Sequence, residues 1–325
     1  MKSFEYSTPE TLDQATALLS NQWGETEVLA GGTDLVTSLK QRTTAPRRVV
    51  SLKRIAGLNS IQADQDHITL GSMTPLIDLV EHAGVNEHFP ALVTAARGIG
   101  SPQILNVGTV GGDLCQRPRC WFFRNGYGLM AKHGDQSLVR EGDNRYHAVF
   151  GNHGDALFVS PSSLGPALIA LGASIHTAGP KGRKREIAAA DFFQTPKNEN
   201  ERETALKPNE IVTAIRIPLS GHKNATYEVR HRHGFDWPYA TATVAFKLTN
   251  GVASDTRIVI GHAAPVPWHA IQAGKALNGQ KVGTDTATQC AEASVEGAKP
   301  LSQNGYKLQL VKTAVKRAIL AAAES

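Results

Sequence analysis

The chain has 325 residues, 41% of them hydrophobic, which is enough to bury sizeable cores in two or three compact units. Its 34 Lys and Arg residues exceed its 29 Asp and Glu residues only slightly, and the excess is spread along the chain, which argues against nucleic-acid binding. The sequence holds no run of 18 apolar residues and no secretory signal, so we expect a cytoplasmic protein without a membrane span. Export with a partner that carries a twin-arginine signal stays open.

The first predicted elements are a helix over residues 8–20, a short strand, a glycine turn and a second helix over residues 33–40. The turn reads Ala30-Gly31-Gly32-Thr33-Asp34-Leu35. Paired glycines after an apolar strand leave backbone N–H groups bare and close enough to cradle a diphosphate.

A second lobe is predicted from strands over 48–51 and 67–72 and helices over 76–82 and 90–97. A similar turn follows, again expected after a strand-like run, and reads Thr109-Val110-Gly111-Gly112-Asp113-Leu114. Either turn alone is more simply a tight turn, but together they predict a large phosphate-bearing ligand. Neither spells G-x-G-x-x-G, so a nicotinamide dehydrogenase of the Rossmann type is not supported.

Further along, the pattern predicts a helix over 160–171, a strand over 173–177, a solvated basic hairpin at 181–185 and a charged loop over 195–209. An antiparallel meander then follows, with strands over 227–231, 239–248 and 257–262. Its alternation predicts one buried face. Two helices end the chain, over 284–297 and 306–322, and the apolar stripe of the second is expected to pack onto the meander.

The two glycine motifs resemble those of the FAD-binding subunit of the molybdenum hydroxylases, the group of xanthine dehydrogenase, aldehyde oxidoreductase and carbon monoxide dehydrogenase. Further landmarks of that family are similar in Phe192-Phe193, Leu206-Lys207-Pro208-Asn209-Glu210-Ile211, Asp236-Trp237-Pro238, Ala264-Pro265-Val266-Pro267-Trp268 and Asn304-Gly305-Tyr306-Lys307. The resemblance covers nearly the whole chain.

The resemblance implies an α/β plus α+β fold. Residues 1–220 would form a two-lobed FAD-binding domain of the PCMH type, similar to vanillyl-alcohol oxidase, with lobes of about 1–55 and 56–220. Residues 221–325 would form a C-terminal α+β domain with an antiparallel sheet and helices.

The resemblance also implies which residues bind FAD. These are Leu29, Ala30, Gly31, Gly32, Thr33, Asp34, Leu35, Thr109, Gly111, Gly112, Asp113, Ser163 and Ile211. Ser163 and Ile211 would lie near the flavin, and the two aspartates would act through hydroxyl or backbone contacts, since a carboxylate aimed at a diphosphate repels it. The chain departs from the family where Ser163 replaces the usual Asp and Glu228 a common Lys, so we expect FAD to bind with altered affinity or potential.

By the same resemblance the chain is an FAD-carrying electron-transfer subunit, an oxidoreductase component without acid or base catalysts of its own. A partner with 2Fe-2S clusters would supply electrons, and a molybdopterin-binding large subunit would oxidise an aldehyde or heteroaromatic substrate. The FAD would pass the electrons to an external acceptor. The absence of a recognisable Ser/His/Asp, H-E-x-x-H or paired-carboxylate motif agrees with catalysis by the cofactor.

Three cysteines, Cys115, Cys120 and Cys290, are too few for a disulfide framework. Cys115 and Cys120 stand beside three arginines and form at most half of an iron-sulfur site. Some family members hold a 4Fe-4S cluster in this region, but here the later ligand positions fall near Met130, Val139 and Ala156, so we predict no cluster. Substitute ligands remain conceivable in His133, His147, His153 and Asp155.

The remaining histidines are interpreted as structural residues. His231 and His233 share a strand face and could bind a metal weakly, although an exposed basic loop is the simpler interpretation. His262 is expected to be a structural residue at a strand end.

Two alternatives to the electron-transfer subunit remain. One is a free-standing flavin oxidase of related fold, and the other is a non-enzymatic assembly subunit that has lost FAD. The intact glycine turns argue against the second. The roles of Arg117 and Arg119, in FAD binding, partner binding or the loop alone, are left open.

Overall fold

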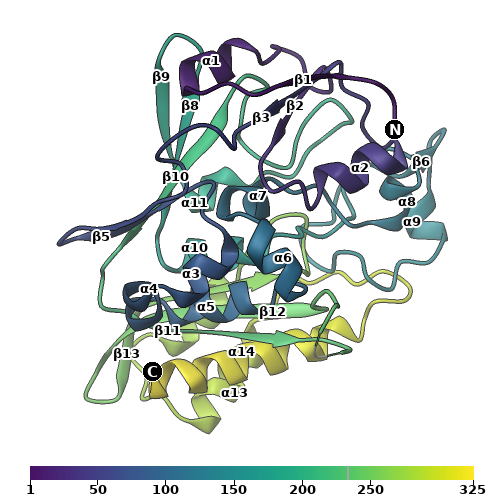
Figure 1. Ribbon diagram of the computed structural model, residues 1–325. Helices are drawn as coiled ribbons and strands as arrows, with labels where there is room; N and C mark the ends of the chain where they lie inside the picture. The colour runs from purple at the N-terminus through teal and green to yellow at the C-terminus, as the bar shows by residue number, and fades with distance from the viewer. Residues whose placement is uncertain (233) are drawn as a thin grey trace.

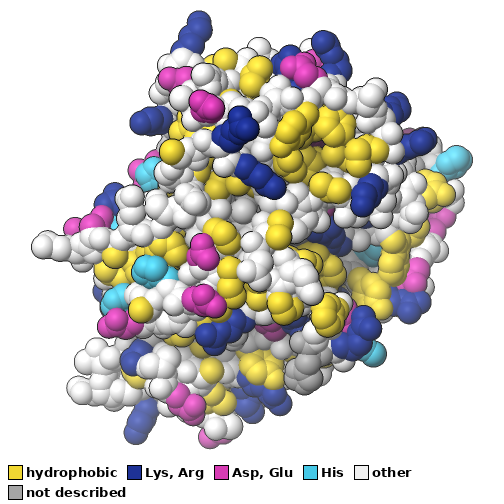
Figure 2. Space-filling view, in the orientation of Figure 1, with side chains coloured by type: hydrophobic (Ala, Val, Ile, Leu, Met, Phe, Trp, Pro, Cys, Tyr) yellow, Lys and Arg dark blue, Asp and Glu magenta, His cyan; other side chains and the backbone are white. Residues whose placement is uncertain are grey.

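The computed structural model describes residues 1–232 and 234–325. Three sheets follow one another from the N-terminal lobe at one end of the molecule to the long C-terminal helix at the other (Figure 1). Over the described residues, no helix is both long and apolar enough to cross a bilayer. On the face shown in Figure 2, Lys and Arg side chains are dispersed and form no single patch.

The N-terminal lobe is built on a parallel sheet of three strands in the order β1 (Glu5–Ser7), β3 (Arg48–Ser51), β2 (Thr26–Leu29). Two short helices accompany it, α1 (Leu12–Ala17) and α2 (Leu35–Gln41). The first is shorter than predicted because the Thr11 side chain accepts the N–H of Gln14 and so begins the helix late. Ala15, Val50, Leu52 and Leu58 form the small core of the lobe.

The middle region contains an antiparallel sheet in the order β4 (Ile61–Ala63), β5 (His67–Gly71), β10 (Ile211–Pro218), β8 (Ser174–Gly179), β9 (Arg183–Ala188). The central strand β10 was missed from the sequence, because a bulge between Val212 and Ala214 breaks its alternation. The basic cluster lies at the predicted β8–β9 hairpin, where Gly179 pairs with Arg183.

The helices of the middle region are α3 (Leu76–Glu81), α4 (Ala83–His88), α5 (Pro90–Arg97), α6 (Pro102–Val107), α7 (Val110–Cys115), α10 (Leu164–Ala170) and α11 (Ala189–Phe192). Their apolar side chains and those of the sheet make the largest core. The helix predicted from residue 160 begins only at Leu164.

The C-terminal region is an antiparallel sheet in the order β11 (Lys223–Val229), β12 (Ala240–Thr249), β13 (Val252–Gly261), β14 (Trp268–His269). Its helices are α12 (Ile271–Leu277), α13 (Thr284–Ala293) and α14 (Lys307–Glu324), and α14 packs onto the sheet as predicted. The prediction of one buried face was wrong. Val244 and Phe246 face the C-terminal helices, while Ala245 and Val259 join the core formed with α5 and α10, so both faces are buried.

Residues 120–156, the insertion, contain α8 (Trp121–Arg124), β6 (Lys132–His133), β7 (Gln136–Ser137) and α9 (Leu138–Glu141). The insertion has small cores of its own. One consists of Phe123, Leu129, Met130, Ala156 and Phe158, with Cys120 packed against it.

Candidate functional site

A cleft opens between the N-terminal lobe and the middle region, and we call it the interlobe cleft. Its walls come from segments far apart in the chain: the β2–α2 turn, the start of α7 with the residues after it, and residues 202–212 that lead into β10. Ten of the thirteen predicted FAD-binding residues line it: Ala30, Gly31, Gly32, Thr33, Asp34, Leu35, Thr109, Gly111, Gly112 and Ile211.

The first glycine turn lies against the backbone of the middle region. A Cβ atom on Gly31 would stand 1.9 Å from the carbonyl oxygen of Val107, and Gly32 has φ +87°, so neither position tolerates a side chain. Within the described chain, the backbone N–H groups of residues 30–34 donate to no other group. This turn therefore offers the row of bare amides that an anionic ligand requires.

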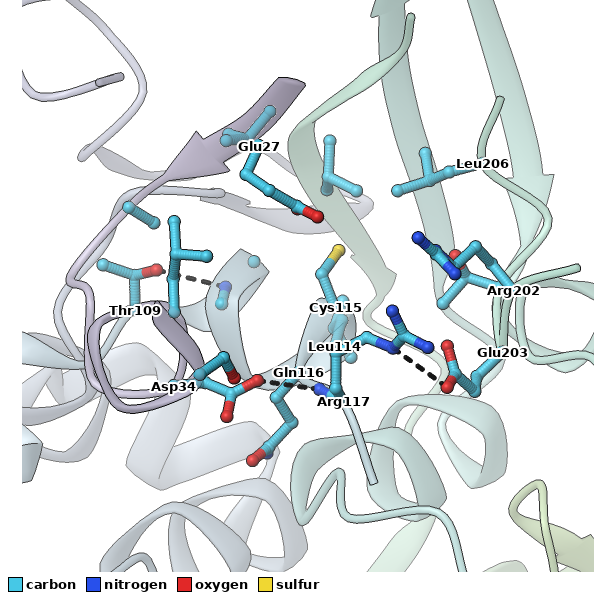
Figure 3. A pocket seen from close by; sticks show the side chains of 18 of the residues that line it. Glu27, Asp34, Thr109, Leu114, Cys115, Gln116, Arg117, Arg202, Glu203 and Leu206 are labelled. Carbon is cyan, nitrogen blue, oxygen red and sulfur yellow. Dashed lines mark hydrogen bonds and ion pairs between the residues drawn. The ribbon is translucent and has the colours of Figure 1, made fainter. Parts of the chain in front are cut away.

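The second glycine turn differs from the prediction. It follows helix α6 and not a strand, and Gly111 and Gly112 lie within the first turn of α7, where Thr109 is the N-cap. The N–H of Gly111 donates to the carbonyl of Ser72, and that of Gly112 to the Thr109 hydroxyl at 3.1 Å (Figure 3). These amides are not bare, so this turn forms a close wall for a ligand while the first turn supplies the donors.

The Asp34 carboxylate points away from the bare amides and toward residues 117–124. These residues lie just before the insertion and at its start. The carboxylate accepts the backbone N–H of Arg117 at 2.8 Å (Figure 3). It also forms ion pairs with Arg119 and Arg124, each at 2.8 Å. Arg124 in addition donates to the Ser38 hydroxyl in α2. The turn of the N-terminal lobe is thus fastened to residues 117–124.

Three predicted residues lie outside the lining of the cleft: Leu29, Asp113 and Ser163. Leu29 is the last residue of β2. Asp113 accepts the Ser162 hydroxyl at 2.6 Å and the Leu164 N–H at 3.0 Å, and so ties α7 to the start of α10. The Ser163 N–H contacts the same carboxylate at 3.3 Å. Burial raises the pKa of Asp113, and these hydrogen bonds oppose that rise.

The sequence did not assign four charged residues to the cleft that line it in the structure: Glu27, Arg117, Arg202 and Glu203 (Figure 3). Burial raises the pKa of Glu27, while Arg202 and Arg117 lower it. Arg117 bonds to Glu203 at 3.0 Å, and the Arg202 guanidinium lies 5.0 Å from the ring centre of Trp23. The alternation of β2 could have indicated Glu27, but nothing in the loop before β10 singled out Arg202.

Cys115 points into the interlobe cleft near Glu27 (Figure 3). Its thiol is reachable from solvent through the cleft, although protein surrounds it on most sides. This burial, together with the nearby Asp113 charge, raises the pKa of the thiol to about 12. The group is therefore a neutral thiol at pH 7 and a poor metal ligand.

Cys120 lies apart from Cys115 and contacts His147, with 3.2 Å between Sγ and Nε2. Met130, Val139 and Ala156, which stand near the family's cluster-ligand positions, are buried among apolar side chains. In the described parts of the chain, the one group of three potential metal ligands is Asp64, Asp66 and His67, on the β4–β5 turn. The donor set of the insertion thus does not fit a 4Fe-4S cluster. The proposed weak site at His231 and His233 includes a residue outside the described ranges.

Residues 2–220 match the family model described as the FAD binding domain in molybdopterin dehydrogenase. The chain belongs to this family. Residues 225–322 match a second model, the CO dehydrogenase flavoprotein C-terminal domain. Family membership makes FAD the cofactor and places the chain among the oxidoreductase subunits of molybdopterin-dependent enzymes, as the resemblance implied.

Relatives extend over the whole chain. The aldehyde oxidoreductase FAD-binding subunit PaoB of Escherichia coli is 30% identical, with 96% of each chain covered. The carbon monoxide dehydrogenase medium chain of Hydrogenophaga pseudoflava is 27% identical over 98% of this chain and 96% of its own. Their names as subunits and medium chains indicate that members of the family work within larger complexes.

Solved structures of family members have the same fold. Carbon monoxide dehydrogenase from H. pseudoflava, lacking the Mo-pyranopterin moiety of its cofactor, superposes with a TM-score of 0.78 at 26% identity and covers 99% of this chain and 97% of its own. Quinoline 2-oxidoreductase from Pseudomonas putida 86 superposes with a TM-score of 0.77 at 22% identity, covering 99% and 98%, and supports the fold alone.

The interlobe cleft fits FAD on grounds of its own geometry. Bare amides at residues 30–34 suit a diphosphate, and Arg202 provides positive charge, whereas the charge of Arg117 is paired with Glu203. Apolar side chains such as Leu206 and Ile211 suit an aromatic ring system on the same path.

Proposed function

We propose that this subunit holds FAD in the interlobe cleft and relays electrons from a 2Fe-2S partner to an external acceptor. A molybdopterin-binding large subunit would carry out the substrate oxidation, and the complex would reside in the cytoplasm, where free cysteines persist. Bound FAD accepts electrons one or two at a time, which is the chemistry a relay needs. Residues 1–220 would bind the cofactor, and residues 221–325 would complete the subunit.

The observation that carries the proposal is the row of bare amides in the first glycine turn, opposite Arg117 and Arg202. In this arrangement the amides would donate to the diphosphate, and Arg202, together with Arg117 in its pair with Glu203, would lie near its negative charge. Glu27, which lines the cleft, would accept a hydrogen bond from a hydroxyl or amino group of FAD. The Asp34 carboxylate contributes through its hold on residues 117–124 and does not face the phosphates.

The accessible thiol of Cys115 permits a direct test of where FAD binds. Protein freed of FAD is labelled with N-ethylmaleimide at pH 8.5, with and without added FAD, and modification of each cysteine is followed by mass spectrometry. FAD in the cleft covers Cys115, so saturating FAD is expected to slow its labelling by about tenfold or more.

Cys290 is the internal control, because it is fully buried in the C-terminal core and its labelling reports unfolding only. The variant Cys115→Ser should bind FAD normally and take up no label at position 115. This result would show that the label slowed by FAD in the wild type is on the Cys115 thiol and does not report loss of fold. Unchanged labelling of Cys115 under saturating FAD would place the cofactor outside the interlobe cleft.

A further inference from the structure

Asp34 ends the row of bare amides in the first glycine turn, but its carboxylate does not bond to its own helix. Asp34 is the N-cap residue of α2, and an aspartate at this position ordinarily accepts a backbone N–H from the first turn of the helix. In the described chain the carboxylate makes no such bond. Asp34 nevertheless lines the interlobe cleft, and its side chain is 16% exposed. The orientation of this carboxylate therefore has a cause outside α2.

Three groups from one short segment hold the carboxylate instead. One of its oxygens accepts the backbone N–H of Arg117 at 2.8 Å (Figure 3). The other oxygen pairs with the guanidinium groups of Arg119 and Arg124, each at 2.8 Å. Two full positive charges attract a carboxylate more strongly than the partial charge at the start of a helix does. Residues 117–124 therefore set the orientation of Asp34.

Arg124 is itself fixed by hydrogen bonds to protein. Its side chain is only 10% exposed, and it donates to the carbonyls of Arg117 and Pro118 at 2.8 and 2.7 Å. It also donates to the Ser38 hydroxyl in α2 at 2.7 Å. Each of the three guanidinium nitrogens thus has an acceptor within the chain. The group is rigid, and the carboxylate that it binds is held with it.

The orientation of Asp34 decides the charge that a ligand meets at the first glycine turn. Without the arginines, the carboxylate can turn back to accept N–H groups at the start of α2, as an aspartate at an N-cap does. It would then stand beside the bare amides of residues 30–34, and its negative charge would repel a diphosphate at that place. With Arg119 and Arg124 present, two positive groups accompany one negative group, so the cluster as a whole is positive.

We propose that Arg119 and Arg124 are positioning residues for FAD, which hold the Asp34 carboxylate out of the diphosphate site and keep the first glycine turn open to an anion. Neither arginine lines the interlobe cleft, so both act through Asp34 and not by contact with the cofactor. Because Arg124 lies in α8 of the insertion, the insertion gains a role in FAD binding that needs no iron-sulfur cluster. This inference rests on the proposed function, which places the diphosphate at the first glycine turn.

Removal of the arginines with and without the carboxylate separates this role from simple support of the fold. FAD dissociation constants are measured by isothermal titration calorimetry on protein freed of FAD. Arg119→Gln/Arg124→Gln should weaken FAD binding by about tenfold or more, because the Asp34 carboxylate is then free to turn toward the amides. In the Asp34→Ala background, the same two substitutions should change the dissociation constant by less than about threefold, since no carboxylate is left to be held.

Arg140→Gln is the matched control. Arg140 also lies in the insertion, but it donates to the carbonyls of Asn152 and Gly154 and not to Asp34, so its replacement should leave the affinity for FAD unchanged. The melting temperature of every variant is recorded to confirm that it is folded.

Arg124→Lys is a milder substitution for the same comparison, should the double variant not fold. Lysine keeps the positive charge but lacks the planar fork that binds several acceptors at once. It should weaken FAD binding less than the double variant does, and Asp34→Ala should again abolish the effect.

Equal weakening by the arginine substitutions in both backgrounds would overturn the proposal, since the arginines would then support the fold or contact FAD directly. Unchanged binding by folded Arg119→Gln/Arg124→Gln would overturn it too. Loss of FAD binding in Asp34→Ala alone would have the same meaning, because the carboxylate would then be needed at the site. Protection of Cys115 by FAD tests the proposed function separately. Protection in the wild type without coupling between Asp34 and the arginines would reject this inference and leave the proposed function standing.

Discussion

The acidic residues of the two glycine motifs hold protein segments together. Asp34 binds the backbone of Arg117 and the side chains of Arg119 and Arg124, and Asp113 binds the start of α10. The sequence predicts that both aspartates act through hydroxyl or backbone contacts and do not meet the diphosphate, and this stays a prediction. It does not identify their protein partners, because these lie 49 to 90 positions away along the chain.

We expect Asp34→Asn to lower the free energy of unfolding by about 1–3 kcal/mol, because it leaves two half-buried guanidinium groups without their counter-charge. Urea denaturation measures this effect. The control is Asp143→Asn, whose exposed pair with Arg145 should contribute less than about 1 kcal/mol. Equal losses in the two variants would show that Asp34 does not anchor residues 117–124.

The buried amine of Lys307 predicts that the free energy of unfolding depends on pH. Burial lowers the pKa of its amine from 10.5 to about 7, although three carbonyl acceptors favour the protonated form. Between pH 7 and 10.5 the unfolded chain holds this proton and the folded chain releases it, so the contribution of Lys307 to the free energy of unfolding rises with pH. The slope is at most about 1.4 kcal/mol per pH unit.

Chemical denaturation of the wild type and of Lys307→Gln at several values between pH 7 and 9.5 checks this expectation. The variant should be less stable throughout, and its stability should rise less steeply with pH. Lys312→Gln, at a partly exposed position of α14 where the amine pairs with Glu292, should keep the slope of the wild type. If the free energy of unfolding rises equally with pH in Lys307→Gln and in the wild type, the lowered pKa of Lys307 is contradicted.

Helices and strands were predicted well where the apolar periodicity is regular, and poorly where tertiary contacts decide the local structure. α5 and β3 were predicted with their observed bounds, and the apolar stripe of α14 was assigned to its sheet. The bulge in β10 and the helical setting of Gly111 and Gly112 could not be read from local patterns. Both depend on hydrogen bonds to distant residues, such as that of Gly111 to Ser72.

The side chains of the insertion predict that the protein binds no iron-sulfur cluster. Apolar side chains fill the positions near Met130, Val139 and Ala156, so thiolate ligands are missing where a cluster would need them. Anaerobically purified subunit should release FAD on acid treatment and contain no stoichiometric iron, as measured by elemental analysis. Iron at about four atoms per chain, with broad absorption near about 400 nm, would contradict this expectation.

Because the cleft lies between two lobes, we expect bound FAD to stabilise the folded protein against unfolding. The N-terminal lobe and the middle region each provide part of the wall, so bound FAD adds contacts to both. Protein freed of FAD should gain about 2.7 kcal/mol when FAD reaches a hundred times its dissociation constant. Thermal unfolding with increasing FAD measures this gain, and riboflavin, which lacks the diphosphate, is the control.

A melting temperature that does not respond to FAD would mean that FAD does not bind the folded protein, and it would contradict the proposed function. The resemblance of the motifs to a known family implied this two-lobed arrangement. The sequence did not indicate that the amides of Gly111 and Gly112 are already bonded, because their acceptors are the Thr109 hydroxyl of the helix cap and the carbonyl of Ser72.

The central strand β12 has helices on both sides, and this has a consequence for engineering. Ala245 and Val259 pack against the helices of the middle region, and the Asn224 side chain bonds to the N–H of Ala91 and the carbonyl of His88. A cut near residue 220 would therefore expose apolar surface that the two parts bury against each other. Chimaeras that exchange the C-terminal segment between relatives will need the α4–α5 surface to be exchanged with it.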